Sequence, residues 1–509
     1  MESIVNAIND LVWSPALVFL CLATGLYFSV RSGFLQLRLI REMWRLLFQS
    51  REDDHGVSSF QALSMTLAGR VGTGNIAGVA TAICFGGPGA LFWMWMVAFL
   101  GSASAFIEST LGQIYKEKIR GEYTGGPAFY LEKGAGSRLL GWIFAIITIF
   151  ACGLLLPSVQ SNSIAAAVNN AFGIPNTITA ACLTTLLCFI LFGGLHRIAN
   201  FTTIVVPFMA QAYVIVSLII VFYNYEQIPH VVSMIFSSAF GMDSAFGAII
   251  GMAVSWGVKR GIYSNEAGQG TGPHASSAAA VSHPAKQGLV QAFSVYIDTW
   301  FVCSATGFMI LTTGCYNVIN PEGMSLFQGL QNIEAGPVYT QMAVESVMPG
   351  FGSPFVAVAL FFFAFTTILA YGYISETNVR YINRTLKWPV LIALVRIAVM
   401  SSCAFGAIKS ASLAWTLGDI GVGLMAWVNI FAILWLQKPA LKCLRDYEEQ
   451  MKAGVDPVFH PEKLGIENAS YWTMDRAERN LEIEREEGVE NAPMARGLRR
   501  LIQKLFNNH

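Results

Sequence analysis

The chain has 509 residues, of which 54% are hydrophobic and only 13% are charged, with 32 basic and 32 acidic side chains. Its mean hydropathy is +0.51, and a typical soluble protein carries about 25% charged residues. This composition excludes a soluble globular protein and predicts an all-α polytopic membrane protein that has the lipid bilayer as a partner. The balanced charge does not favour nucleic acid, and the nine cysteines show no CxxC spacing. The sequence therefore predicts neither a metal cluster nor a disulfide framework.

Apolar segments of membrane-spanning length predict about eleven transmembrane helices. They lie near residues 13–31, 58–86, 88–115, 139–170, 176–194, 200–223, 244–271, 286–313, 351–380, 388–408 and 414–437. Basic residues gather in the loops after the odd-numbered spans, whereas the opposite loops hold only Lys409. Because basic residues collect on the cytoplasmic side, we predict an external N-terminus and a cytoplasmic C-terminus in the plasma membrane.

The second predicted span contains the stretch AGRVGTGNIAG at residues 68–78. Each of its four glycines costs a helix about 1 kcal/mol relative to alanine and permits non-helical dihedrals, so we expect the helix to break here. At membrane depth, freed backbone groups are tolerated where they are buried in protein, line a cavity or meet a ligand. Amides of the following half-helix suit a carboxylate, and carbonyls of the preceding half suit a cation. The break predicts a binding site; close packing of two helices is the alternative.

The seventh predicted span repeats this glycine pattern in GMAVSWGVKRGIYSNEAGQGTGP, residues 251–273. If the second to sixth and the seventh to eleventh spans form two units, each unit begins with a broken helix. Because each unit has an odd number of spans, the two units enter the membrane from opposite sides and are inverted relative to each other. Inverted repeats with broken helices are typical of secondary transporters. The predicted parts are an extra N-terminal helix and basic loop (1–56), a first repeat (57–224), a second repeat (225–437) and a cytoplasmic tail (438–509). The alternative is that residues from Gly261 onward form a solvated inner loop.

The tail changes in composition beyond Gly454. Residues 494–506 place leucine and isoleucine on one helical face with arginine and lysine beside it, which predicts an interfacial helix attracted to anionic lipid. A solvated, disordered end is the alternative. We expect this end to be peripheral to transport.

Five motifs in order give the chain a family resemblance. They are AGRVGTGNIAG, GGPGALFWMW (86–95), GGPAFYL (125–131), YSNEAGQGT (263–271) and YIDT (296–299). Together they resemble the alanine or glycine:cation symporter family over about residues 10–465. The resemblance implies sodium-coupled uptake of a small neutral amino acid, such as alanine or glycine, on the leucine-transporter fold with one extra N-terminal helix. It implies a monomeric transporter, not an enzyme, with no cofactor and with sodium as the coupling ion.

The resemblance also implies which residues contact the substrate. They are Gly72, Thr73, Gly74 and Asn75 at the first break and Ser255, Trp256 and Gly257 at the second break, in the seventh span. The backbones of the first three would face the carboxylate, and Asn75 would serve the substrate or a second cation. The seventh-span group would face the ammonium and the side chain. In the fourth span, Gln160 and Asn162 are candidates for the remaining wall.

A sodium site is implied where the first break meets the ninth span. The carbonyls of Ala68 and Val71 would face the ion, and Phe363, Thr366 and Thr367 would complete its coordination. Carbonyls and hydroxyls supply the oxygen ligands that hard cations prefer. The alternative for the two threonines is a hydrogen bond back to the preceding turn of their own helix.

Several charged residues in or beside the predicted spans need partners, because a lone charge is costly in a membrane. They are Arg70, Glu108, Lys259, Arg260, Glu266 and Glu376. We predict a buried ion pair between Arg70 and Glu108 or Glu376; a direct grip on the substrate carboxylate is the alternative. We predict that the two adjacent seventh-span cations form a cytoplasmic gate with Glu266 or Glu108.

Other functions make different demands on the sequence. A proton-coupled carrier of the same fold would use Glu108, Asp298 or Glu376 as the proton acceptor. A membrane-embedded enzyme would need a nucleophile and base or a metal cluster, and the seven histidines show no HExxH. An ATP-driven pump would need GxxxxGK[ST], which the sequence lacks. A channel would be distinguished by the absence of saturable counterflow. Alanine, glycine, serine and glutamine all remain candidate substrates.

Overall fold

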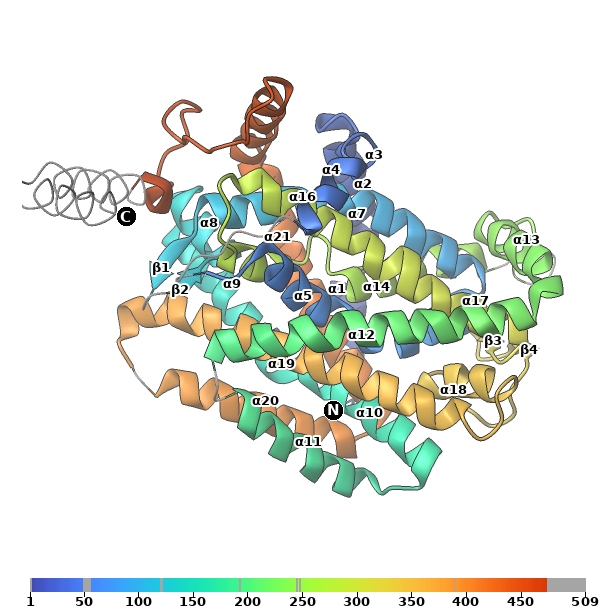
Figure 1. Ribbon diagram of the computed structural model, residues 1–509. Helices are drawn as coiled ribbons and strands as arrows, with labels where there is room; N and C mark the ends of the chain where they lie inside the picture. Colours follow the sequence, from blue (N-terminus) through green and yellow to red (C-terminus); the bar gives the residue numbers. More distant parts are fainter. Residues whose placement is uncertain are drawn as a thin grey trace, which may run out of the picture.

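The computed structural model describes residues 2–48, 56–119, 122–191, 194–243, 246, 249–388 and 390–473, most of them in helices (Figure 1). The first helices are α1 Glu2–Val12, α2 Pro15–Arg31, α3 Leu35–Arg38, α4 Ile40–Leu47, α5 Ser59–Arg70, α6 Val79–Gly86, α7 Gly89–Ile114, α8 Pro127–Lys133, α9 Arg138–Phe150, α10 Leu156–Phe172, α11 Asn176–Leu191 and α12 Gly194–Tyr223. The others are α13 Ile228–Ala239, α14 Ile250–Asn265, α15 Gly272–Ala278, α16 Pro284–Tyr296, α17 Ser304–Thr313, α18 Pro337–Glu345, α19 Gly352–Leu386, α20 Leu391–Ile408 and α21 Ala411–Lys452. Two small antiparallel hairpins pair β1 Glu117–Ile119 with β2 Glu122–Thr124 and β3 Asn317–Ile319 with β4 Ser325–Gln328.

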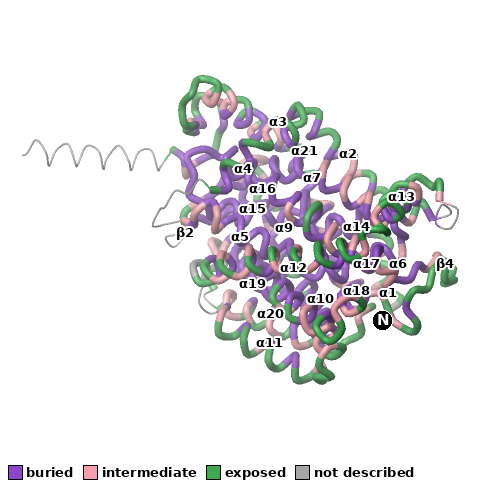
Figure 2. Tube along the Cα trace, turned by 45° about the vertical axis from the view of Figure 1, so that its right-hand side comes forward, coloured by how far each residue is buried: buried purple, intermediate pink, exposed green. Residues whose placement is uncertain are grey.

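Within the described residues, eight helical stretches are long and apolar enough to cross a membrane. Two shorter apolar stretches, Gly74–Gly86 and Asn176–Leu191, accompany them. The outer surface carries apolar side chains such as Ile204 and Phe208 on α12, which are 74% and 78% exposed, while residues toward the interior are buried (Figure 2). Lipid supplies the apolar surroundings that such a surface needs. This confirms the predicted helical polytopic membrane protein; the count of eleven spans stays a prediction because the broken helices are short.

The first predicted break lies where the glycines placed it. Helix α5 starts at a capping box between Ser58 and Gln61 and ends at Arg70. A π-helical turn, Gly74–Gly78, follows the gap and leads into α6. Helix α5 packs against α12, α15 and α19, and α12 and α19 lie side by side in Figure 1. The break is therefore enclosed by helices from both halves of the chain.

The second break lies later than the sequence indicated. Helix α14 runs unbroken through Ser255, Trp256 and Gly257 as far as Asn265. Gly257 instead permits close helix packing, because a Cβ there would lie 2.5 Å from Trp93 Cβ on α7. The prediction of a break at 255–257 is wrong.

The helix interruption falls between α14 and α15. Glu266, Gly268 and Gly270 have φ values of 55°, 81° and 91°, which are left-handed conformations that favour glycine. The segment is not the solvated loop that the sequence left open, because Ser264, Asn265 and Glu266 are all at most 1% exposed. Both broken helices therefore place irregular backbone inside the protein.

The predicted interfacial helix at 494–506 lies outside the described residues. The tail before it is described as far as residue 473, and its residues Phe459, Ile466 and Trp472 are buried. This part of the tail belongs to the folded body of the protein.

Candidate functional site

The first break holds two backbone amides that have left the helical pattern. The N–H of Gly72 donates to Asn75 Oδ1 at 2.8 Å, and the N–H of Thr73 donates to Gln160 Oε1 at 3.0 Å. Both acceptors are neutral side-chain oxygens, and Thr73, Asn75 and Gln160 are at most 1% exposed. Such orphan amides at the start of a half-helix are a ready site for an anionic group. The two side-chain oxygens occupy the position that a carboxylate could take.

The wall beside these amides comes from the end of α14. A Cβ on Gly74 would lie 3.1 Å from Ser264 Cα and 3.2 Å from Tyr263 Cδ1. Sequence reasoning assigned this wall to residues 255–257, which lie about two turns earlier in the same helix. The motif YSNEAGQGT, which begins at Tyr263, contained the signal that could have identified it.

Of the two fourth-span candidates, Gln160 alone reaches the break. Asn162 donates to the carbonyls of Gly406 and Lys409 at 2.9 and 2.8 Å, and so it ties α10 to the end of α20. Trp256 stacks on Phe85 with a centroid distance of 4.8 Å, away from the two amides.

The residues expected at the sodium site come together in part. Thr367 Oγ1 donates to Ala68 O at 2.8 Å and to Phe363 O at 3.0 Å. A Cβ at Gly72 would clash with the same hydroxyl oxygen, so α19 approaches the break as closely as a glycine allows. Val71 caps α5 at this point. The structure thus brings carbonyl and hydroxyl oxygens of α5 and α19 into contact.

Thr366 differs from its neighbour. Its hydroxyl donates to Phe362 O and Phe363 O, both at 2.9 Å, which are carbonyls of its own helix. This is the back-bonding arrangement that the sequence left open as an alternative.

A second polar cluster surrounds Asp298, which is fully buried in the π-helical turn Ile297–Cys303. Its carboxylate accepts from Asn75 Nδ2 at 2.6 Å, from Ser264 Oγ at 2.9 Å and from Thr299 Oγ1 at 2.8 Å. All three donors are neutral, so the hydrogen bonds satisfy the carboxylate without cancelling its charge. The sequence named Asp298 only as a proton acceptor; an acidic residue inside an apolar span was the available signal.

Arg70 does not form the predicted ion pair. Its Nη1 donates to Gln291 O at 3.1 Å and to Ser294 Oγ. Within the described part of the chain, its Nε and Nη2 have no hydrogen-bond partner and Arg70 makes no salt bridge. The prediction of a direct pair with Glu108 or Glu376 is wrong.

Both predicted partners are occupied elsewhere. Glu108 accepts from the amides of Gly268 and Gly270 at 3.3 and 3.1 Å and from Asn429 at 2.7 Å, so it caps the second break. Glu376 pairs with Arg380 at 2.8 Å and with Arg396 at 2.7 Å.

Lys259 and Arg260 pair with a carboxylate that the sequence did not single out. Their nitrogen atoms lie 2.7 and 2.6 Å from Asp419 on α21. The predicted pairing with Glu266 or Glu108 is therefore wrong; Glu266 accepts instead from Thr271 Oγ1 at 2.7 Å.

The position of this triad also differs from the prediction. A Cβ on Gly78 would lie 3.9 Å from Arg260 Cδ and 3.7 Å from Trp415. The triad therefore lies on the α6 side of the first break, the side that the charge pattern assigns to the exterior. The Arg260 guanidinium lies over the Trp415 ring at 4.3 Å, which adds a cation–π contact to the cluster.

Comparison with known proteins gives consistent matches over most of the chain. Residues 1–461 match the model of the sodium:alanine symporter family. YrbD of Bacillus subtilis (strain 168) is 57% identical over 93% of this chain and 98% of its own length. The sodium/proton-dependent alanine carrier protein of Bacillus sp. (strain PS3) is 50% identical over 84% of this chain and 97% of its own. GlnT of Bacillus subtilis (strain 168), named a probable sodium/glutamine symporter, is 41% identical over 92% of this chain and 95% of its own.

Proposed function

Because the chain belongs to the sodium:alanine symporter family, we propose that it is a secondary active transporter that imports alanine together with sodium by alternating access. One observation carries this proposal. Two orphan amides, those of Gly72 and Thr73, lie in a buried helix break and are held by neutral side-chain oxygens. A zwitterionic amino acid can replace those oxygens with its carboxylate.

The substrate would bind with its carboxylate on the amides of Gly72 and Thr73. Asn75 and Gln160 would then turn from the amides toward the substrate, where their oxygens suit an ammonium group. The close approach of Tyr263 and Ser264 to Gly74 supports a small side chain. Residues 255–257 have no part in this proposal, because Trp256 packs against α6 and Gly257 against α7.

Sodium would bind where Thr367 Oγ1 meets Ala68 O, with the carbonyls of Val71 and Phe363 as further oxygens. Thr366 would support this site only from within its own helix. Such a site joins α5 of the first predicted repeat to α19 of the second. A bound cation would favour the arrangement in which these two helices meet, to the extent of its differential affinity for the two states.

The Asp298 cluster would hold a second positive charge. Its carboxylate is buried among neutral donors, including the Asn75 amide, and a buried anion needs a cation or a proton. Sodium at this site would agree with the predicted second role of Asn75. Protonation of Asp298 is the alternative, and the sodium/proton-dependent relative favours keeping it.

The wider organisation follows the sequence predictions. The repeats would comprise residues 57–224 and 225–437, between an N-terminal part (1–56) and a cytoplasmic tail (438–509). The N-terminus would be external, the protein would lie in the plasma membrane, and a monomer would suffice for transport.

Substrate identity can be tested by binding. Purified protein in nanodiscs should bind labelled L-alanine in a sodium-dependent manner, and unlabelled alanine should compete better than glycine, serine or glutamine. Stronger competition by glutamine would assign the chain the substrate named for GlnT. Alanine binding that depends on pH but not on sodium would favour the proton-coupled alternative.

A further inference from the structure

The chain folds back across one end of the molecule after α21. Residues 455–473, called here the carboxyl-terminal strap, leave the helix at Gly454, where φ is +75°, and lie toward α8 and the β1–β2 hairpin (Figure 1). Ile466, Ala469 and Trp472 of the strap are each less than 10% exposed, although the family match ends at residue 461. Buried side chains therefore anchor the strap to the folded body at intervals, while residues between them are exposed.

The strap binds the segment that follows α15, the second broken helix. Phe459 N–H donates to Ser282 O at 3.0 Å, and Ser282 Oγ donates to Pro457 O at 2.8 Å. An ion pair between Asp456 and Lys286 at 2.5 Å closes the same contact. These bonds fix the strap to the connection between α15 and α16.

The same connection is bonded to the start of α5, the first broken helix. Val57 N–H donates to Ala278 O, and Ala280 N–H donates to Val57 O, both at 2.9 Å. Backbone hydrogen bonds thus tie the connection between α15 and α16 to the strap at Ser282 and to Val57, two residues before α5. The start of α5 and the end of α15, one half of each broken helix, are therefore tied to one another next to the strap.

An aromatic cage fixes the strap to α7. Lys116, which follows α7, is fully buried, and its Nζ donates to Ala279 O at 2.9 Å. The same ammonium lies 4.5 Å from the ring centres of Tyr123 and Tyr471 and 5.3 Å from that of Trp472. Cation–π contacts gain strength when the cation is desolvated. The cage therefore couples the strap, α7 and the segment after α15.

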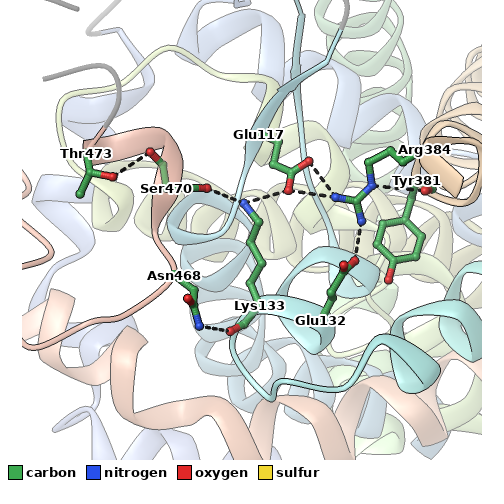
Figure 3. A network of polar contacts seen from close by, with 8 residues as sticks. All are labelled: Glu117, Glu132, Lys133, Tyr381, Arg384, Asn468, Ser470 and Thr473. Carbon is green, nitrogen blue, oxygen red and sulfur yellow. Dashed lines mark hydrogen bonds and ion pairs between the residues drawn. The ribbon is translucent and has the colours of Figure 1, made fainter. Parts of the chain in front are cut away.

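A further set of contacts reaches α8 and α19 (Figure 3). Lys133 Nζ donates to Ser470 Oγ at 2.8 Å, and Asn468 Nδ2 donates to Lys133 O at 3.0 Å. Lys133 also pairs with Glu117 at 3.0 Å, and Glu117 pairs with Arg384 at the end of α19 at 2.9 Å. The strap is thus linked to the helix that carries the proposed sodium site.

We propose that the carboxyl-terminal strap is a latch that holds α15, and through it the start of α5, against α7 and so keeps this side of the transporter closed. The proposal rests on the proposed function, because a latch matters only if this side opens to release substrate. The strap suits a releasable contact, since it contains little regular secondary structure and is held by many bonds of modest individual strength. Its detachment would free both broken helices together.

The test uses two reporter cysteines in the full chain, Ser277→Cys on α15 and Ser64→Cys on α5, both at buried serines. Maleimide labelling rates are measured in nanodiscs, with the chain lacking each reporter as background. Truncation after Gly454 removes the strap, whereas truncation after residue 473 keeps it. Trp472→Ala removes one anchor, and Glu462→Ala changes an exposed strap residue as its matched control.

Loss of one anchor should shift an opening equilibrium by up to about tenfold, so Trp472→Ala should raise both labelling rates by about that factor. Truncation after Gly454 should raise them further, and the two controls should match the full chain. Unchanged labelling in Trp472→Ala would overturn the latch. Faster labelling at position 277 without faster labelling at position 64 would also overturn it, because the strap would then merely cover α15. Because labelling requires no transport, a chain that fails to take up alanine would refute the proposed function separately. A truncated chain that does not fold leaves the decision to Trp472→Ala.

Discussion

Replacing Thr367 with alanine should weaken sodium selectively. The hydroxyl is fully buried and donates to Ala68 O at 2.8 Å, across the boundary between α5 and α19. In the sodium-bound state, the substitution removes an oxygen that contacts a charge, which costs about 1.5–3 kcal/mol. In the sodium-free state, it removes a neutral hydrogen bond worth about 1 kcal/mol, and this loss offsets part of the first. The net change of about 1 kcal/mol corresponds to an increase of about fivefold in the sodium concentration for half-maximal uptake.

The assay is alanine uptake into proteoliposomes as a function of external sodium. Thr367→Ser keeps the hydroxyl and should stay within about twofold of the wild type, which makes it the matched control. Thr366→Ala should also be mild, because its hydroxyl bonds only to its own helix. Alanine affinity at saturating sodium should change little in all three variants. If Thr367→Ala transports with unaltered sodium dependence, the ion does not bind between α5 and α19.

Three further substitutions probe charge in the structure. Arg70→Ala should lower the yield and melting temperature of folded protein, because the buried guanidinium donates hydrogen bonds to α16 and losing them should cost about 1–3 kcal/mol of stability. Normal folding with loss of alanine binding alone would favour the carboxylate-grip alternative. Asp419→Asn should destabilise the protein by about 3–5 kcal/mol, because it leaves two buried cations without their partner, and an unchanged melting temperature would contradict this. Glu345, outside the spans, accepts two backbone amides of the following turn, which lowers its pKa. The carboxylate of Glu345 therefore orders that loop above its unfolded pKa, and this contribution is lost as the pH falls through the lowered folded pKa. Limited proteolysis of the loop should accelerate only on acidification. Glu345→Gln should remove this dependence on acid.

The first break could be predicted because its cause is local. Glycines at 69, 72, 74 and 78 act on their own backbone, so their effect can be read without knowing the neighbouring helices. The contact between Thr367 and Ala68 is different, since it joins residues 299 positions apart. That contact was predicted from the family resemblance, because no repeating pattern of residues in the sequence indicates which distant residues meet.

The position of the second break could not be predicted from its glycines alone. Glycine permits both helix breaking and close packing, and the sequence of α14 does not separate the two. Gly257 serves packing against α7, whereas Gly268 and Gly270 adopt positive φ. The choice depends on a neighbouring helix that is distant in the sequence.

Partners of buried charges were missed for a related reason. Asp419 was available to Lys259 and Arg260 only because α21 packs beside α14, 159 residues further along the chain from Arg260. Glu108 accepts backbone amides, which no pattern of charged residues identifies. A need for a partner could be predicted, but its identity depends on tertiary packing.

The central claim is that a sodium gradient drives alanine accumulation, and gradient-driven uptake tests it most directly. Proteoliposomes containing the protein are given an inward sodium gradient at equal internal and external pH, with the membrane potential clamped. Labelled L-alanine should accumulate above its external concentration and leave again when the sodium gradient is collapsed. Accumulation driven equally well by a proton gradient without sodium, or mere equilibration of alanine across the membrane, would contradict the account.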